Sequence, residues 1–89
     1  ILMDEQSNEI VRQQMLKVVN NQLKMNDPPE TKTTFNRLKK LGYSSSDAKM
    51  LIGRCVAGEI NEIMKSQRPF DEDRFVKALE RLPEIDLDE

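Results

Sequence analysis

Helix-breaking residues occur at three places in this chain and divide it into four segments, each with the apolar spacing of a helix. The breaks are Asp27 to Pro29, Gly42 to Ser44 and Arg68 to Phe70. Proline lacks the N–H that a helix needs and pushes the preceding residue out of the α region, while glycine readily adopts the left-handed conformation that ends a helix. Between the breaks, apolar residues recur three or four positions apart. We therefore predict an all-α fold, with helices over about residues 8–25, 28–41, 45–66 and 72–82.

Residues that favour helix ends stand at the predicted boundaries. Side-chain oxygens of Ser and Asp accept hydrogen bonds from the free N–H groups of a first helical turn, so these residues are favoured just before a helix begins. Pro28 is expected at the first position of the second helix, where no N–H is needed, and Gly42 at its end. The predicted N-caps are, in chain order, Ser7, Asp27, Ser44 and Asp71.

The third predicted helix is the longest and has the broadest apolar face, so we expect it at the centre of the fold. Gly53 and Gly58 lie inside it, and each costs roughly 1 kcal/mol relative to alanine. That cost is tolerable where another helix comes close. We predict a single domain over residues 1–89, in which four antiparallel helices pack around the third, with residues 1–7 and 84–89 as frayed ends.

The composition excludes the usual kinds of active site. The 89 residues include no histidine and a single cysteine, Cys55, so common zinc and haem sites and the Ser-His-Asp and Cys-His arrangements cannot form. No apolar run approaches the roughly 18 residues of a membrane span, and residues 1–8 lack the features of a signal peptide. We therefore expect a cytoplasmic protein that is not an enzyme, with no catalytic residues, no metal, no cofactor and no small-molecule substrate.

Several short motifs follow one another between Asp27 and Pro83. They are residues 27–30 (DPPE), 37–38 (RL), 42–44 (GYS), 48 (A), 51–52 (LI), 59–60 (EI), 69–72 (PFDE), 78–79 (AL) and 82–83 (LP). In this order they resemble a small bacterial all-helical domain family of unknown function. The resemblance implies a cytoplasmic, all-helical bacterial protein and supplies no catalytic residues, because the matching positions are mainly helix caps and core residues. Residues 8–25 lie outside it.

The first predicted helix carries more apolar surface than one neighbouring helix would bury. It joins the rest of the chain only through the elbow at Asp27 to Pro29, and its apolar residues cover a wide part of its circumference. An exposed apolar strip is typical of an interaction surface. We therefore predict a protein–protein interaction or dimerisation domain, with a homodimer through this helix as one form. The predicted partner surface consists of Ile10, Val11, Leu16, Val19 and Leu23.

Residues 38–54 allow a second interpretation, as a helix-turn-helix corner of a nucleic-acid-binding or regulatory module with Gly42 at the turn. The same corner resembles the first turn of a ubiquitin-associated-type module, and an ordinary helical corner is a third interpretation. Against nucleic acid, the net charge is −2, and Leu38 is bulky where the DNA-binding motif usually has a small residue. A basic patch that would face a phosphate, an acidic partner or the acidic C-terminal segment consists of Lys32, Arg37, Lys39 and Lys40.

Two groups in the third helix have both a functional and a structural interpretation. Glu59 and Glu62 are three residues apart on one side of the helix, as in carboxylate metal sites, but no histidine accompanies them. We expect these carboxylates to be solvated or paired with Lys65. Cys55 falls on the apolar face, so we expect a buried thiol that acts as a small hydrophobic residue and not as a nucleophile.

Overall fold

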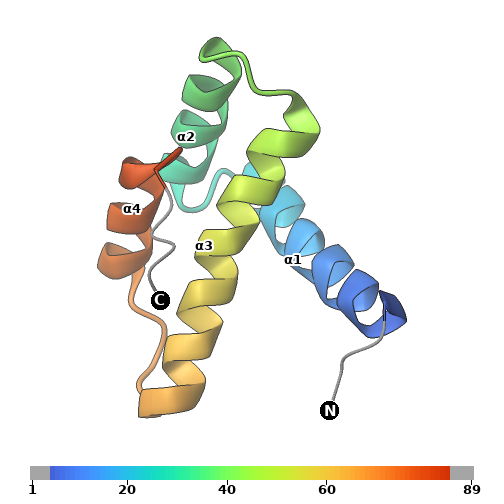
Figure 1. The fold of residues 1–89 in the computed structure, drawn as a ribbon. Helices are drawn as coiled ribbons and strands as arrows, with labels where there is room; N and C mark the ends of the chain where they lie inside the picture. The colour runs from blue at the N-terminus through green and yellow to red at the C-terminus, as the bar shows by residue number, and fades with distance from the viewer. Residues whose placement is uncertain (1–4, 85–89) are drawn as a thin grey trace.

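A computed structural model describes residues 5–84 of the chain, with the backbone alone described for residues 5–8 and Val11. Within this range the chain forms four helices and no strand (Figure 1). The predicted all-α cluster is therefore confirmed. Of the predicted frayed ends, residues 5–7 belong to the first helix, and residues 1–4 and 85–89 lie outside the described residues. The helices are α1 (Glu5–Met25), α2 (Pro29–Lys40), α3 (Ser45–Ser66) and α4 (Glu72–Arg81).

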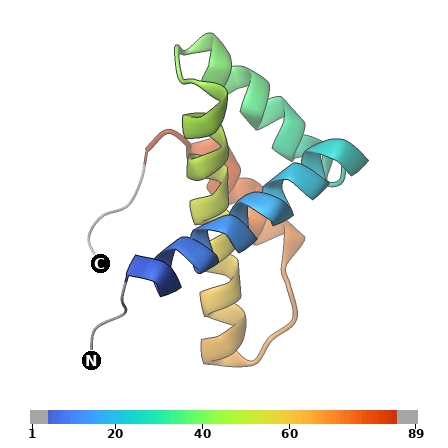
Figure 2. The same cartoon turned by 90° about the vertical axis from the view of Figure 1, so that its right-hand side faces the viewer.

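The third helix lies at the centre, as predicted, and α1, α2 and α4 all pack against it. Figure 1 shows α2 and α4 on one side of α3, both running against its chain direction. Seen from the side, α1 crosses α3 obliquely instead of running along it (Figure 2). The helices α2 and α4 are thus antiparallel to α3. The helix α1 instead contacts α3 around one crossing point and diverges from it on both sides of that point.

Gly53 lies at that crossing point. A Cβ atom at Gly53 would stand 3.6 Å from Cβ of Met15 and 3.9 Å from Cγ2 of Val19, which is ordinary packing distance. A Cβ atom at Gly58 would meet nothing within 4 Å. The expectation of a close neighbouring helix therefore holds at Gly53 and fails at Gly58, and α3 continues unbroken through both positions.

The core is apolar and draws on every helix. Around it pack half-buried residues that include Leu23, Phe35 and Tyr43. This shared core matters most for α2 and α4, which have 12 and 10 residues, because helices of that length are marginal alone in water. The buried apolar residues are Val19, Leu38, Ala48, Ile52, Val56, Phe75, Leu79 and Leu82.

Two of the predicted N-caps are confirmed. The side chain of Ser44 accepts a hydrogen bond from the Asp47 N–H at 3.0 Å, and that of Asp71 accepts one from the Arg74 N–H at 3.2 Å. Gly42, the residue after the C-cap Leu41 of α2, has a φ of 107°, as its predicted role in ending that helix requires. Each of these signals depends on residues that are close together in the sequence.

The other two predicted N-caps are wrong. The first helix begins at Glu5, so Ser7 lies within it and not before it. The second begins at Pro29, and the residue before it is Pro28, which has extended backbone angles and no side-chain cap. Since a residue that precedes a proline is pushed out of the α region, Pro28 cannot be helical, and Asp27 is moved too far from the first turn to cap it.

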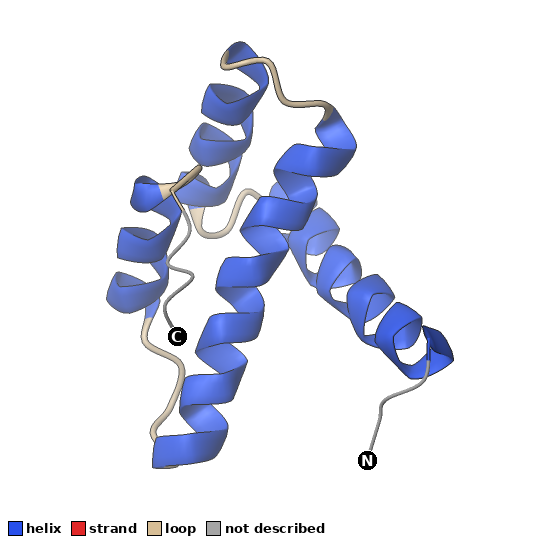
Figure 3. Ribbon diagram, viewed as in Figure 1, coloured by secondary structure: helices blue, strands red, loops and turns tan. Residues whose placement is uncertain are grey.

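The longest connection between helices, residues 67–71, joins α3 to α4 (Figure 3). The rings of Phe70 and Phe75, one in this connection and one in α4, have centroids 5.7 Å apart. This contact sets the entry of α4 onto α3, and it matches a hydrophobic staple at the start of a helix. In the described part of the chain, no helix combines the length and apolar content that crossing a membrane requires.

Candidate interaction surface

The residues of the predicted partner surface do not form one surface. Val19 is fully buried in the core, where it packs near Gly53 of α3, so it stabilises the fold and offers nothing to a partner. Leu16 and Leu23 are half-buried, and Ile10 is 52% exposed. Ile10 lies roughly 120° around α1 from Leu16, since successive helical residues are about 100° apart. The side chain of Val11 lies outside the described residues.

A hollow does exist beside the point where α1 and α3 cross. Arg12, Met15 and Leu16 of α1 line one wall, and α3 supplies the other wall. Its volume is about 200 Å³. A cavity of about 150 Å³ accommodates benzene, so this hollow has room for one large apolar side chain. The α3 wall consists of Met50, Gly53, Arg54 and Ala57.

Exposed apolar residues continue along α3 beyond this hollow. Ile60 is 38% exposed and Met64 is 74% exposed, and both follow Ala57 at helical spacing on the same side of α3. We call Ala57, Ile60 and Met64 the α3 strip. Because α1 crosses α3 obliquely, it turns away from this strip (Figure 2). The strip is therefore an apolar part of the central helix that the described chain leaves uncovered.

Charged residues border the hollow and the strip. Arg12 is exposed and lies 3.5 Å from the carboxylate of Glu9, a surface pair that contributes little to stability. Arg54 is exposed at the edge of the hollow, and it forms no ion pair with any of the side chains that the structure describes. Lys65 is exposed about three turns after Arg54, on the same side of α3. An apolar strip with basic residues along one edge favours a partner that carries acidic residues.

The predicted basic patch is divided by the fold. The guanidinium of Arg37 donates hydrogen bonds to the backbone oxygens of Leu82, at 2.5 Å, and Leu79, at 2.9 Å. It therefore satisfies carbonyl groups at the end of α4 instead of facing solvent. Lys39 donates to Ser45 Oγ at 2.8 Å, while Lys32 and Lys40 are simply exposed. The carbonyl groups at a helix C-terminus need hydrogen-bond donors, but this rule does not identify the residue that supplies them. The sequence therefore contains no specific signal for the role of Arg37.

Glu59 contradicts the expectation of a solvated carboxylate. It is buried, and it accepts hydrogen bonds from Arg74 Nε at 2.6 Å and Arg74 Nη2 at 3.1 Å. The Asp71 N–H also points to it, at 3.4 Å. The hydrogen bonds from Arg74 lower the pKa of Glu59, so this carboxylate is ionised at neutral pH. Glu59 thus ties α3 to the start of α4, and Lys65 is not its partner.

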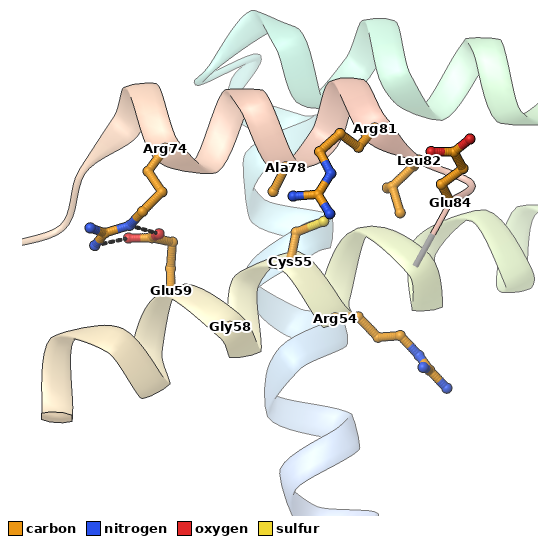
Figure 4. Close-up of a pocket in the computed structure, with 9 residues that line it drawn as sticks. All are labelled: Arg54, Cys55, Gly58, Glu59, Arg74, Ala78, Arg81, Leu82 and Glu84. Atoms are coloured by element: carbon orange, nitrogen blue, oxygen red, sulfur yellow. Dashed lines mark hydrogen bonds and ion pairs between the residues drawn. The ribbon is translucent and has the colours of Figure 1, made fainter. Parts of the chain in front are cut away.

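Cys55 packs against the core on the apolar face of α3, but it is half-buried and not buried as predicted. It lines a second hollow, between α3 and α4, which Figure 4 shows in close-up. Burial raises the pKa of its thiol to about 11, although the charge of Arg81 acts in the opposite direction. The thiol is therefore protonated at neutral pH, and a protonated thiol is a poor nucleophile.

Neither carboxylates nor the thiol assemble into a metal site in the part of the chain that the structure describes. No three Asp, Glu, Cys or His side chains there are grouped so that they could hold an ion. Glu62, which would join Glu59 in a carboxylate metal site, is half-buried one turn along α3. Glu59, however, already forms an ion pair with Arg74.

No family model, curated protein or solved structure matches this chain significantly.

Proposed function

We propose that this protein is a non-enzymatic protein-interaction domain whose partner is a second copy of the same chain. The observation that carries the proposal is the uncovered α3 strip, where Met64 is 74% exposed on the central helix of the fold. An apolar strip of this kind, next to a hollow with room for one large side chain, is typical of interaction surfaces. Self-association is also a common way for so small a domain to gain buried surface.

The first half of α1 is suited to occupy that strip in a second molecule. It extends away from the body of the protein (Figure 1; Figure 2), and Ile10 is exposed on it. In a twofold dimer, each α1 would lie on the α3 strip of the other copy, so that every contact occurs twice. Both the apolar strip and the projecting helix are then covered by one symmetric arrangement.

The charges agree with this arrangement. Glu9 lies on the projecting half of α1, whereas Arg54 and Lys65 edge the α3 strip. Opposite charges would therefore meet where α1 of one copy approaches α3 of the other. A dimer that brought the two α3 strips together directly would instead place arginine and lysine of both copies close to one another.

The supporting experiment is sedimentation of the purified chain over a range of concentrations. We expect a dimer, and we expect Met64→Glu to raise its dissociation constant at least about tenfold because a buried charge replaces an apolar contact. Met25→Glu is the matched control, since Met25 is 70% exposed at the other end of α1 and should not affect assembly. A wild-type chain that remains monomeric at every concentration would overturn the proposal.

The absence of an enzymatic role is part of the proposal. It is supported by the protonated state of the Cys55 thiol and by the engagement of Glu59 with Arg74, which leave no activated nucleophile or free buried carboxylate at these two positions. A cytoplasmic location remains our proposal too, because a chain with a lone cysteine has no internal disulfide to form. Membership of a bacterial all-helical family is likewise a proposal.

Nucleic-acid binding through the basic patch has less support. Arg37 is engaged with the end of α4, and Lys39 is engaged with Ser45, so the patch offers Lys32 and Lys40 as unengaged charges. Binding to duplex DNA at low salt that weakens in a Lys32→Glu, Lys40→Glu variant would favour this alternative.

A further inference from the structure

The hollow beside the crossing of α1 and α3, called here the α1/α3 hollow, is not filled by the described side chains of its own chain. Its volume is about 200 Å³, and Met15, Leu16 and Gly53 are among the residues that line it. A cavity of about 150 Å³ accommodates benzene, which is larger than the side chain of isoleucine. The hollow therefore has room for one aliphatic side chain from outside.

Ile10 is an exposed aliphatic side chain on α1 that points away from this hollow. It is 52% exposed. Successive residues of a helix are about 100° apart, so Ile10 lies roughly 120° around α1 from Leu16 and roughly 140° from Met15. Both of those residues face the hollow. Ile10 therefore cannot fill the hollow of its own chain, whereas Ile10 of a second copy can approach it from outside.

The charges at the hollow favour Ile10 over Met25 and Leu41, two further exposed apolar residues. Arg54 edges the hollow, and it has no acidic partner among the described side chains. Figure 4 shows this arginine directed away from α4. Ile10 directly follows Glu9, whereas Met25 and Leu41 each directly follow a lysine. Only Ile10 of these three would thus bring a negative charge toward Arg54.

Glu9 is able to turn toward a partner because its present ion pair is weak. It lies 3.5 Å from Arg12, and both side chains are about half exposed. Such a surface pair contributes at most about 1 kcal/mol. Arg12 lies roughly 160° around α1 from Ile10, and Lys17 follows Glu9 by about 12 Å along the helix. Glu9 is therefore the charge on α1 that is best placed to meet Arg54.

We propose that the α1/α3 hollow is completed by Ile10 of a second copy, with Glu9 of that copy beside Arg54. The contact rests on the proposed function, since α1 of one copy must lie on the α3 strip of the other. Ala57 belongs to both the hollow and the strip, so the two form one continuous surface. Isoleucine is branched at Cβ and loses little rotamer freedom on docking. In a twofold dimer, both hollows are filled together.

Sedimentation of variants tests whether Ile10 holds the two copies together. Ile10→Ala should raise the dissociation constant of the dimer at least about tenfold, as truncation of a central interface side chain does. Gln14→Ala, one turn later on the same side of α1, is the matched control and should have little effect. Ala57→Leu places a larger side chain at the hollow and should also weaken the dimer. In that variant, Ile10→Ala should have little further effect, because the two residues share one contact.

A disulfide between copies measures the contact directly. In a Cys55→Ala background, a chain with Ile10→Cys is mixed with a chain with Ala57→Cys, so that any bond between positions 10 and 57 joins two molecules. A disulfide needs Cβ atoms about 4 Å apart, so under mild oxidation this mixture should form at least about fivefold more of the mixed disulfide than one of Met25→Cys and Ala57→Cys chains. Mass spectrometry identifies and measures the product.

The outcomes separate this contact from dimerisation itself. If the wild type dimerises, either an unchanged dissociation constant in Ile10→Ala or no excess of the 10–57 disulfide would overturn the docking of Ile10 and leave the dimer standing. A wild-type chain that stays monomeric at every concentration would overturn the proposed function as well. Circular dichroism checks that each variant is folded, which we expect because Ile10 and Ala57 are both exposed.

Discussion

The two sides of α3 are covered by helices that are held in different ways. On one side, α4 has only 10 residues, but Arg74 near its start pairs with Glu59 and the carbonyl groups at its end accept from Arg37. On the other side, α1 has 21 residues, crosses α3 at Gly53 and is joined to α2 by a hydrogen bond of 2.9 Å from Thr31 Oγ1 to Gln22 Oε1. Polar contacts thus fix both ends of α4, whereas α1 is held by apolar packing around its crossing point with α3.

Removal of a large core side chain on the α4 side should have the greatest effect. Phe75 is fully buried in the core, so Phe75→Ala should cost about 3–5 kcal/mol of unfolding free energy. Leu16→Ala, at a half-buried position of α1, should cost clearly less. Urea unfolding followed by circular dichroism compares the two. Equal losses would contradict the distinction between the two sides of α3.

The ion pair that ties α3 to α4 should be the next largest contribution. Glu59→Gln weakens hydrogen bonds between charged groups, and we expect a loss of about 1–3 kcal/mol. The loss is moderated because Arg74 is 35% exposed and water can solvate it. Glu62→Gln is the matched control one turn along the same helix, and it should change stability little. A neutral result for Glu59→Gln would show that α4 is held by its apolar contacts alone.

The same pair predicts a dependence on pH. Arg74 lowers the pKa of Glu59 below its ordinary value of 4.5, so the folded state favours the ionised carboxylate. Its contribution to stability is therefore complete above about pH 4.5 and is lost as the pH falls through the lower pKa of the folded state. The stability difference between wild type and Glu59→Gln should shrink on acidification in that range. A stability difference that stays constant over this pH range would contradict the role of the ionised Glu59 carboxylate in stabilising the fold.

The two glycines of α3 give the smallest expected effect. Gly58→Ala should stabilise the protein by about 0.5–1 kcal/mol, because it removes the flexibility of glycine and the added methyl group meets nothing. Gly53→Ala should be tolerated, since its methyl group would stand 3.6 Å from Met15 Cβ. Thermal unfolding of both variants measures this. If Gly53→Ala destabilises the protein and Gly58→Ala does not, α1 and α3 pack too closely at their crossing point to admit the added methyl group.

Much of the fold was predictable because its signals are local. The breaks at Pro28, Gly42 and Pro69 separate the helices, and Ser44 and Asp71 cap the helices that follow them. Where prediction failed, at Ser7 and Asp27, the error was a shift of a few residues in a helix start. The confirmed caps form bonds between residues three positions apart, so the sequence around them contains all the information needed.

The candidate sites were much less predictable. Apolar periodicity placed Val19 on a partner surface, although it belongs to the core, and charge counts placed Arg37 in a basic patch, although it binds carbonyl groups of α4. No pattern in the sequence marked the α3 strip as exposed. Periodicity identifies which residues of a helix are apolar, but it does not say which neighbouring helix covers them or where.

The sequence by itself determined the number of helices in the described range, their approximate limits and the central place of the third, because backbone preferences, caps and apolar spacing act over a few residues. Tertiary structure alone decided the oblique path of α1, the burial of Glu59 and the exposure of Met64. Each of these depends on contacts between segments far apart in the chain. Such contacts are set by the packing of whole helices, which local patterns constrain only weakly.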